Sequence, residues 1–138
     1  MPEGKKKFPA TILLTGSGPQ TRDEEFMTHK PFLVLADHLT KNGVAVLRYD
    51  DRGFAQSTGN HGRAISANFA NDGRAAIAYL KTRKEIDKSR IGLVGHSEGG
   101  LIPPLVAADT EVAFMVLLAA PGVPGSEITL KQAERISE

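Results

Sequence analysis

The chain has 138 residues, of which 41% are hydrophobic and 24% charged, and its formal net charge is +1 at pH 7. That length fits one domain of about 100–200 residues, and the balanced charge provides no bulk attraction to nucleic acid or anionic lipid. The absence of cysteine excludes disulfide scaffolds, thiolate zinc sites and a cysteine nucleophile. The longest apolar run, Val112 to Ala120, is far shorter than the ~20 residues needed to cross a bilayer. We therefore expect a cytoplasmic protein without a signal peptide and with no membrane or nucleic-acid partner.

Apolar runs alternate with helical periodicity along the first half of the chain. Ala10–Thr15 predicts a buried strand that ends in a glycine-rich loop. A helix is predicted to begin at Pro31 and to stop before Gly43. Val44–Tyr49 predicts a second strand, which is followed by a polar loop over 50–62.

The second half of the chain continues this alternation. In order, its predicted elements are a helix capped by Ser66 and running to about Arg83, a strand at Ile91–Val94, a helix to about Ala108, a strand at Phe114–Ala119 and a last helix capped by Thr129. Pro103 and Pro104 should kink the third helix or delay its start, because each lacks an N–H donor. Apolar strands between amphipathic helices predict an α/β protein with a parallel sheet covered on both faces. A ligand site is expected at the carboxyl ends of those strands.

The segment Gly95-His96-Ser97-Glu98-Gly99 matches the G-x-S-x-G string of a nucleophile elbow. It follows a predicted strand and precedes a predicted helix, which is the setting that an elbow requires. The strained turn needs small residues two positions before and after the serine, and Gly95 and Gly99 meet that need. We predict that Ser97 is a catalytic nucleophile. The alternative is a plain Gly/Ser turn between a strand and a helix.

A serine that transfers acyl groups also needs two N–H donors for the oxyanion. We predict the backbone N–H of Glu98 as one donor and that of Ser17 as the other, with Gly18 as the near alternative to Ser17. The alternative for the segment that contains Ser17 and Gly18 is an ordinary Gly-Pro turn without a catalytic role. A dinucleotide-binding G-x-G-x-x-G is disfavoured because Thr21 occupies the last glycine position. No cofactor and no metal site are predicted.

With these residues identified, the sequence resembles the α/β-hydrolase superfamily. It is most similar to the bacterial serine esterase and acyl-hydrolase branch related to dienelactone hydrolases and serine aminopeptidases. Four segments in the family's order carry the resemblance: LLTGSGPQTRDE (13–24), HKPFLVLADHL (29–39), VLRYDDRGFAQSTG (46–59) and IGLVGHSEGG (91–100). The resemblance implies a three-layer αβα fold, incomplete at about four strands, with residues 1–138 as a single partial domain. It also implies Ser97 as nucleophile and Ser17 and Glu98 as the oxyanion hole.

The resemblance further implies that Asp51-Arg52-Gly53 shapes a loop beside the site. We expect Asp51 and Arg52 to pair with each other rather than to act in catalysis. Ala55 departs from the family pattern, because relatives often carry glycine there in an R-G-x-G-x-S string. This departure concerns the conformation of the loop more than the chemistry.

In this fold the catalytic triad follows the chain order serine, acid, histidine. The four histidines are His29, His38, His61 and His96, and all of them precede Ser97. His96 is predicted to be a packed structural residue that points away from the serine, and His38 a partly exposed helix residue. His61 and His29 lie on loops from which they could approach Ser97, but neither is favoured as its base. The triad acid and histidine are thus predicted to be missing from this chain.

Two functional hypotheses follow. The first is a serine hydrolase that acts on carboxylic esters or related small acyl substrates through a Ser97 acyl-enzyme. The alternative is a degenerate, non-catalytic α/β-hydrolase module retained for binding or assembly. Either form would expose a sheet edge where further strands should pair, and two copies could associate through that edge.

Overall fold

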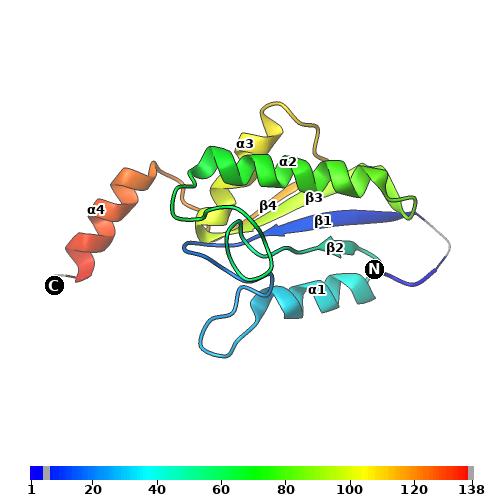
Figure 1. The fold of residues 1–138 in the computed structure, drawn as a ribbon, viewed down its shortest axis with the longest axis horizontal. Coiled ribbons are helices and arrows are strands. Elements are labelled where there is room, and N and C mark those ends of the chain that lie inside the picture. Colours follow the sequence, from blue (N-terminus) through cyan, green and yellow to red (C-terminus); the bar gives the residue numbers. More distant parts are fainter. Residues whose placement is uncertain (5–6, 137–138) are drawn as a thin grey trace.

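A computed structural model describes residues 1–4 and 7–136, apart from the side chain of Thr129. Within these residues one parallel sheet has four strands in the order β2-β1-β3-β4 (Figure 1). The strands are β1 (Phe8–Leu14), β2 (Ala45–Leu47), β3 (Ile86–His96) and β4 (Met115–Leu118). The predicted α/β architecture with a parallel sheet is confirmed.

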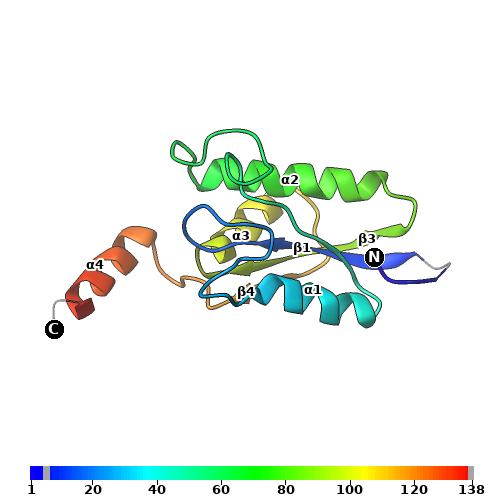
Figure 2. The ribbon, with the colours of Figure 1, turned by 60° about the horizontal axis from the view of Figure 1, so that its bottom comes forward.

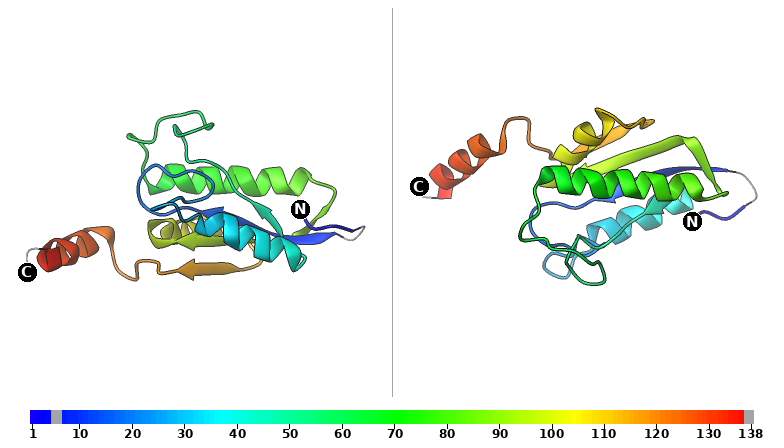
Figure 3. Two further views of the ribbon diagram at one scale, coloured as in Figure 1. Left: turned by 90° about the horizontal axis from the view of Figure 1, so that it is seen from below. Right: turned by 45° about the horizontal axis from the view of Figure 1, so that its top comes forward.

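The helices lie on both faces of the sheet, as a three-layer arrangement requires. They are α1 (Pro31–Lys41), α2 (Ser66–Thr82), the short 3-10 helix η1 (Ser97–Leu101), α3 (Ile102–Ala107) and α4 (Gly125–Ile136). Helix α1 covers one face, and α2 and α3 cover the other (Figure 2). Helix α4 extends away from the sheet in each view (Figures 1 and 3).

Successive residues of β1 supply the two hydrophobic layers. Leu13 packs with Phe32 of α1 on one face. Ile12 and Leu14 point to the other face, where they belong to the larger cluster that includes Ile77 of α2. This alternation is the two-residue period of a strand that is buried on both faces. It explains why the predicted strand was apolar throughout.

The strand bounds differ from the predicted ones most in β3, which begins five residues before Ile91. Its first residue, Ile86, pairs with Phe8 at the start of β1. The polar segment 87–90 separates Ile86 from the apolar run that the sequence makes visible. Pairing with β1 therefore extends a strand that hydrophobicity alone cannot show.

Two predicted helix caps are wrong. Ile65 occupies the cap position of α2, where its N–H donates to Asn68 Oδ1 at 2.9 Å, and Ser66 is already helical. Helix α4 begins at Gly125 rather than after Thr129, because the carbonyl of Pro124 already accepts a hydrogen bond from the Glu127 N–H at 3.0 Å.

The prolines act as predicted in α3. This helix begins only after η1, and Pro103 and Pro104 lie in its first turn. Backbone N–H groups in the first turn have no partner within the helix, so the missing donors cost little there. The late start of the helix is therefore confirmed.

Strand β4 is a sheet edge and carries a continuous apolar surface. The five residues 114–118 are each 38–46% exposed. In the left view of Figure 3, β4 runs along the border of the sheet. An exposed edge of this kind is a template for pairing with another strand. Association of two copies through it stays a prediction.

The turn after β3 is packed so tightly, both within itself and against the end of β1, that two of its positions have room only for glycine. A Cβ atom at Gly95 would lie 2.2 Å from the carbonyl oxygen of Gly99. A Cβ at Gly99 would lie 2.1 Å from the carbonyl oxygen of Thr15. Both distances are far inside van der Waals contact. The close approach brings Ser97 next to the loop that leaves β1.

Gly99→Ala should therefore destabilise the fold by at least about 2 kcal/mol, because the added methyl group meets backbone rather than a movable side chain. Gly122→Ala is the matched control, since a Cβ there meets nothing within 4 Å. Chemical denaturation of both variants measures the difference. Equal stability of the two would contradict the close approach.

The loop that follows β2 contains a strained alanine. Ala55 has a φ of +47°, in the left-handed region that glycine tolerates and alanine does not. The family pattern that the sequence resembles often has glycine at this position. The strain explains in physical terms why that departure concerns conformation.

Replacing Ala55 by glycine should stabilise the protein by about 0.5–1 kcal/mol, because relief of the strain exceeds the entropy that glycine adds to the unfolded chain. Ala78→Gly, at an exposed position in the interior of α2, should instead destabilise by about 1 kcal/mol. Urea titrations of the pair test the opposite signs. A destabilising Ala55→Gly would mean that the loop does not need a positive φ at this residue.

Candidate active site

Ser97 occupies the tip of the sharp turn between β3 and η1. Its φ is +52°, although few non-glycine residues adopt positive values. Its side chain is partly exposed, and a Cβ built at Gly16 would lie 3.3 Å from the Ser97 Cβ. The serine thus stands at the carboxyl edge of the sheet in the strained conformation that the motif predicts.

The loop that leaves β1 faces this serine. The Gly16 N–H is already engaged, because it donates to Glu24 Oε1 at 2.6 Å. Ser17 is exposed, and its carbonyl accepts a hydrogen bond from Gln20 Nε2 at 3.2 Å. Gly18 has a φ of +80° and lines the neighbouring pocket. Ser17 and Gly18 both remain candidates for the second oxyanion donor, whereas Gly16 is excluded in this conformation.

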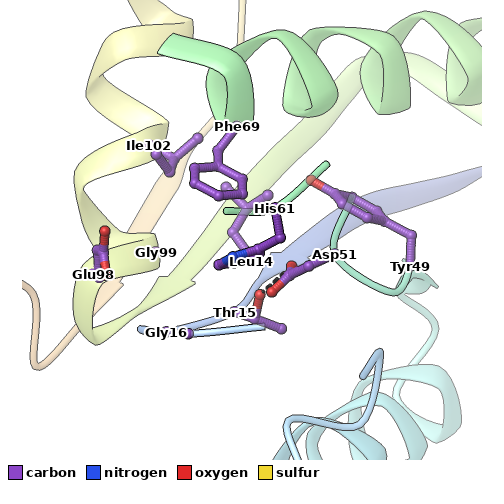
Figure 4. Close-up of a pocket in the computed structure, with 11 residues that line it drawn as sticks. Leu14, Thr15, Gly16, Tyr49, Asp51, His61, Phe69, Glu98, Gly99 and Ile102 are labelled. Atoms are coloured by element: carbon purple, nitrogen blue, oxygen red, sulfur yellow. Dashed lines mark hydrogen bonds between the residues drawn. The ribbon is translucent and has the colours of Figure 1, made fainter. Parts of the chain in front are cut away.

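A pocket opens beside the turn (Figure 4). Its apolar wall is formed by Leu14, Phe69 and Ile102. Its other lining residues are Thr15, Gly16, Gly18, Tyr49, Asp51, His61, Glu98 and Gly99. An apolar wall with a few polar groups is typical of a small-molecule site. The elbow and the loop after β1 both border it.

Asp51 ties the loop after β1 to the pocket. One carboxylate oxygen accepts a hydrogen bond from Thr15 Oγ1 at 2.7 Å, and the other accepts one from the Gln20 N–H at 2.9 Å. Burial raises the pKa of Asp51, and these two hydrogen bonds oppose that rise. The side chain therefore holds the loop.

The expected pairing of Asp51 with Arg52 is wrong. Arg52 instead forms a two-pronged ion pair with Asp72 of α2, through Nε at 2.7 Å and Nη2 at 2.5 Å. Both oxygens of Asp51 already accept hydrogen bonds from the loop after β1, whereas Asp72 presents its whole carboxylate to the guanidinium. Arg52 thus anchors the loop after β2 to α2.

Asp50, the neighbour of Asp51 in the chain, holds Arg22 in the segment between β1 and α1. Its Oδ1 accepts hydrogen bonds from the backbone N–H and Nε of Arg22 at 2.8 and 2.9 Å. The hydrogen bond to the Arg22 guanidinium lowers the pKa of Asp50 well below its usual range. Burial also raises the pKa of Tyr49, which lines the pocket.

The histidines occupy different environments. His96 has a structural contact, because its Nδ1 lies 2.9 Å from Glu24 Oε1. The prediction that its side chain is packed is wrong, because that side chain is 43% exposed. His61 lines the pocket, with its ring centroid 5.4 Å from that of Phe69. His29 and His38 are exposed and do not line this pocket.

Two residues that organise the site could not be recognised from the sequence. Glu24 and Asp72 lie in polar segments that a single sequence presents as solvated surface, and their partners are 8 to 72 residues away along the chain. Among the described residues no cluster of three His, Asp or Glu side chains is placed to hold a metal ion. Nor does that part of the chain contain a helix long and apolar enough to cross a membrane.

Two solved structures share this fold. The α/β hydrolase GrgF from Penicillium superposes with a TM-score of 0.73 at 23% identity, covering 96% of this chain and 46% of its own. An esterase from Pyrococcus furiosus superposes with a TM-score of 0.70 at 23% identity, covering 91% of this chain and 48% of its own. At this identity the likeness concerns the fold alone.

Sequence comparison adds the family. The esterase EstD of Thermotoga maritima is 33% identical over 128 residues, which are 93% of this chain and 31% of that protein. An uncharacterised 31.7 kDa protein of Escherichia coli is 34% identical over 102 residues, 72% of this chain and 32% of its own length. This chain therefore spans about a third of the curated relatives that it matches. The sequence model of the serine aminopeptidase S33 family matches residues 29–136. The chain belongs to this serine aminopeptidase family of α/β hydrolases and spans part of its domain.

Proposed function

We propose that this chain carries the nucleophile of a serine hydrolase that acts on carboxylic esters or related acyl compounds. The observation that carries the proposal is the positive φ of Ser97 at the tip of a strand-to-helix turn beside a pocket. A serine that is held in this way presents its hydroxyl to a bound carbonyl instead of packing it into the turn. The similarity to an esterase supports the ester as substrate class.

In the proposed reaction, Ser97 Oγ bonds to the carbonyl carbon and the carbonyl oxygen becomes the oxyanion. The Glu98 N–H, next to the nucleophile, and the Ser17 N–H stabilise that charge. The carbonyl then re-forms as the C–O bond to the alcohol breaks, and the alcohol leaves with the proton that Ser97 gave up. Water attacks the acyl-enzyme in the same way, so that the acid leaves and Ser97 recovers its proton. The apolar wall at Leu14, Phe69 and Ile102 supports an apolar acyl or alcohol group beside the serine.

The Ser97 proton requires a general base, and we assign it to a histidine outside residues 1–138. No histidine follows Ser97 in this sequence, whereas the family order places the triad histidine after the serine. His61 shares the pocket but precedes the serine and packs beside Phe69. This chain alone should therefore be a weak catalyst, with only the oxyanion donors and the pocket to assist reaction.

A fluorophosphonate reagent should modify Ser97 at least about tenfold faster than other exposed serines, because the oxyanion donors stabilise the adduct. Ser89 and Ser126 are exposed and serve as internal controls. Peptide mass spectrometry of wild type and Ser97→Ala measures the sites. Equal modification of all three serines would contradict the proposal and would favour a non-catalytic module.

The pH dependence of that labelling tests the assignment of the base. Without an imidazole partner only the rare alkoxide form of Ser97 reacts, so the rate should rise about tenfold per pH unit between about pH 6 and 9. A partner histidine of ordinary pKa would instead make the rate level off above about pH 7. A plateau of that kind would show that a histidine within this chain acts on the serine.

A further inference from the structure

Glu24 is a buried carboxylate that touches both sides of the candidate site. It is 6% exposed, and it lies in the segment between β1 and α1. Its Oε1 accepts a hydrogen bond from the Gly16 N–H at 2.6 Å. The same oxygen lies 2.9 Å from Nδ1 of His96, the residue that precedes Ser97. One atom thus joins the loop after β1 to the turn after β3.

The chemistry of the contact defines the protonation of the ring. An ionised carboxylate can only accept hydrogen bonds, so His96 must carry its proton on Nδ1 when it bonds to Glu24. Hydrogen bonds to a charged acceptor are shorter and stronger than neutral ones, which agrees with the 2.6 Å contact to Gly16. The tautomer of His96 therefore reports on the contact independently of any reaction.

The backbone around Glu24 is built to present this side chain. Glu24 has a φ of +51°, and its N–H donates to the carbonyl of Thr21 at 2.9 Å. Arg22, inside the same turn, is held by Asp50 through its backbone and its guanidinium. A left-handed glutamate is strained, and such strain persists only where surrounding contacts over-determine it. Here the turn from Thr21 to Glu24 returns the carboxylate to the site.

We propose that Glu24 is a positioning residue that fixes the oxyanion loop relative to the nucleophile. Because it takes up the Gly16 N–H, the loop can offer the site only the following amide groups, beginning with Ser17. Because it also holds His96, the loop and the Ser97 turn cannot shift independently. This inference rests on the proposed function, which needs donors within about 2.7–3.1 Å of the oxyanion.

The test uses Glu24→Ala, which removes the acceptor, and Glu24→Gln, which keeps a neutral one. Glu25→Gln is the matched control, because Glu25 is exposed and its ion pair is with Lys30 at 3.3 Å. An arylboronic acid serves as probe, since it forms a tetrahedral adduct with a nucleophilic serine. Binding to each variant and to Ser97→Ala is measured by protein NMR, together with the ring nitrogens of His96 and the amides of Gly16, Ser17 and Ser97.

Glu24→Ala should bind the boronic acid at least about tenfold more weakly than wild type, while Glu24→Gln and Glu25→Gln stay within about threefold. Glu24→Ala should also lose the Nδ1–H preference of His96 and shift the Ser17 and Ser97 amides. If Glu24→Ala does not fold, Glu24→Gln provides the test. A neutral amide accepts a weaker hydrogen bond from the Gly16 N–H than a carboxylate does, so the Gly16 amide proton should move upfield. Unchanged Gly16, Ser17 and Ser97 amides in the folded variants would overturn the inference.

The same data separate the inference from the proposed function. Wild type that binds the boronic acid no better than Ser97→Ala would contradict the nucleophile assignment. The response of the His96 ring and of the three amides would still support or overturn the positioning role of Glu24. If wild type and folded Glu24→Ala bind the boronic acid equally well and Ser97→Ala does not bind it, the positioning role of Glu24 alone would be overturned.

Discussion

The turn that carries Ser97 passes so close to the end of β1 that a methyl group has no room at Gly99, and Gly95 packs equally tightly against Gly99 and Gly100 within the turn. The turn follows a sharp path at this point and holds the serine at a positive φ. It also sets the serine beside Gly16, the first glycine after β1. The parallel pairing of β1 with β3 makes the contact possible, because it brings the carboxyl ends of both strands to one edge.

Buried carboxylates complete the arrangement. Among the described residues the buried charged side chains are Glu24, Asp50 and Asp51, and each of them holds the segment that leaves β1. A buried carboxylate is costly unless donors surround it, so each acid retains its place only while the loop supplies those donors. The acids and the loop therefore fix one another. Such a loop can keep amide groups aimed at one point without regular secondary structure.

The architecture and the sharp turn at Ser97 could be predicted because they depend on local patterns. Apolar runs, the glycines around Ser97 and the prolines of α3 each act on neighbouring residues. Glu24 and the partner of Arg52 could not be predicted, because their contacts join segments far apart in the chain and a single sequence shows them only as polar residues. Ala55 could be predicted only in part. The resemblance to the family pointed to this position, but the left-handed φ that strains an alanine there is visible only in the backbone.

We propose that Ser97 and the amides around it form a site for a tetrahedral acyl intermediate. The most direct measurement is a crystal structure of this chain with a bound arylboronic acid. We expect a tetrahedral boron bonded to Ser97 Oγ, with one boronate oxygen about 2.7–3.1 Å from the N–H groups of Glu98 and Ser17. A boron attached to another residue, or an oxygen that neither amide contacts, would contradict the proposal.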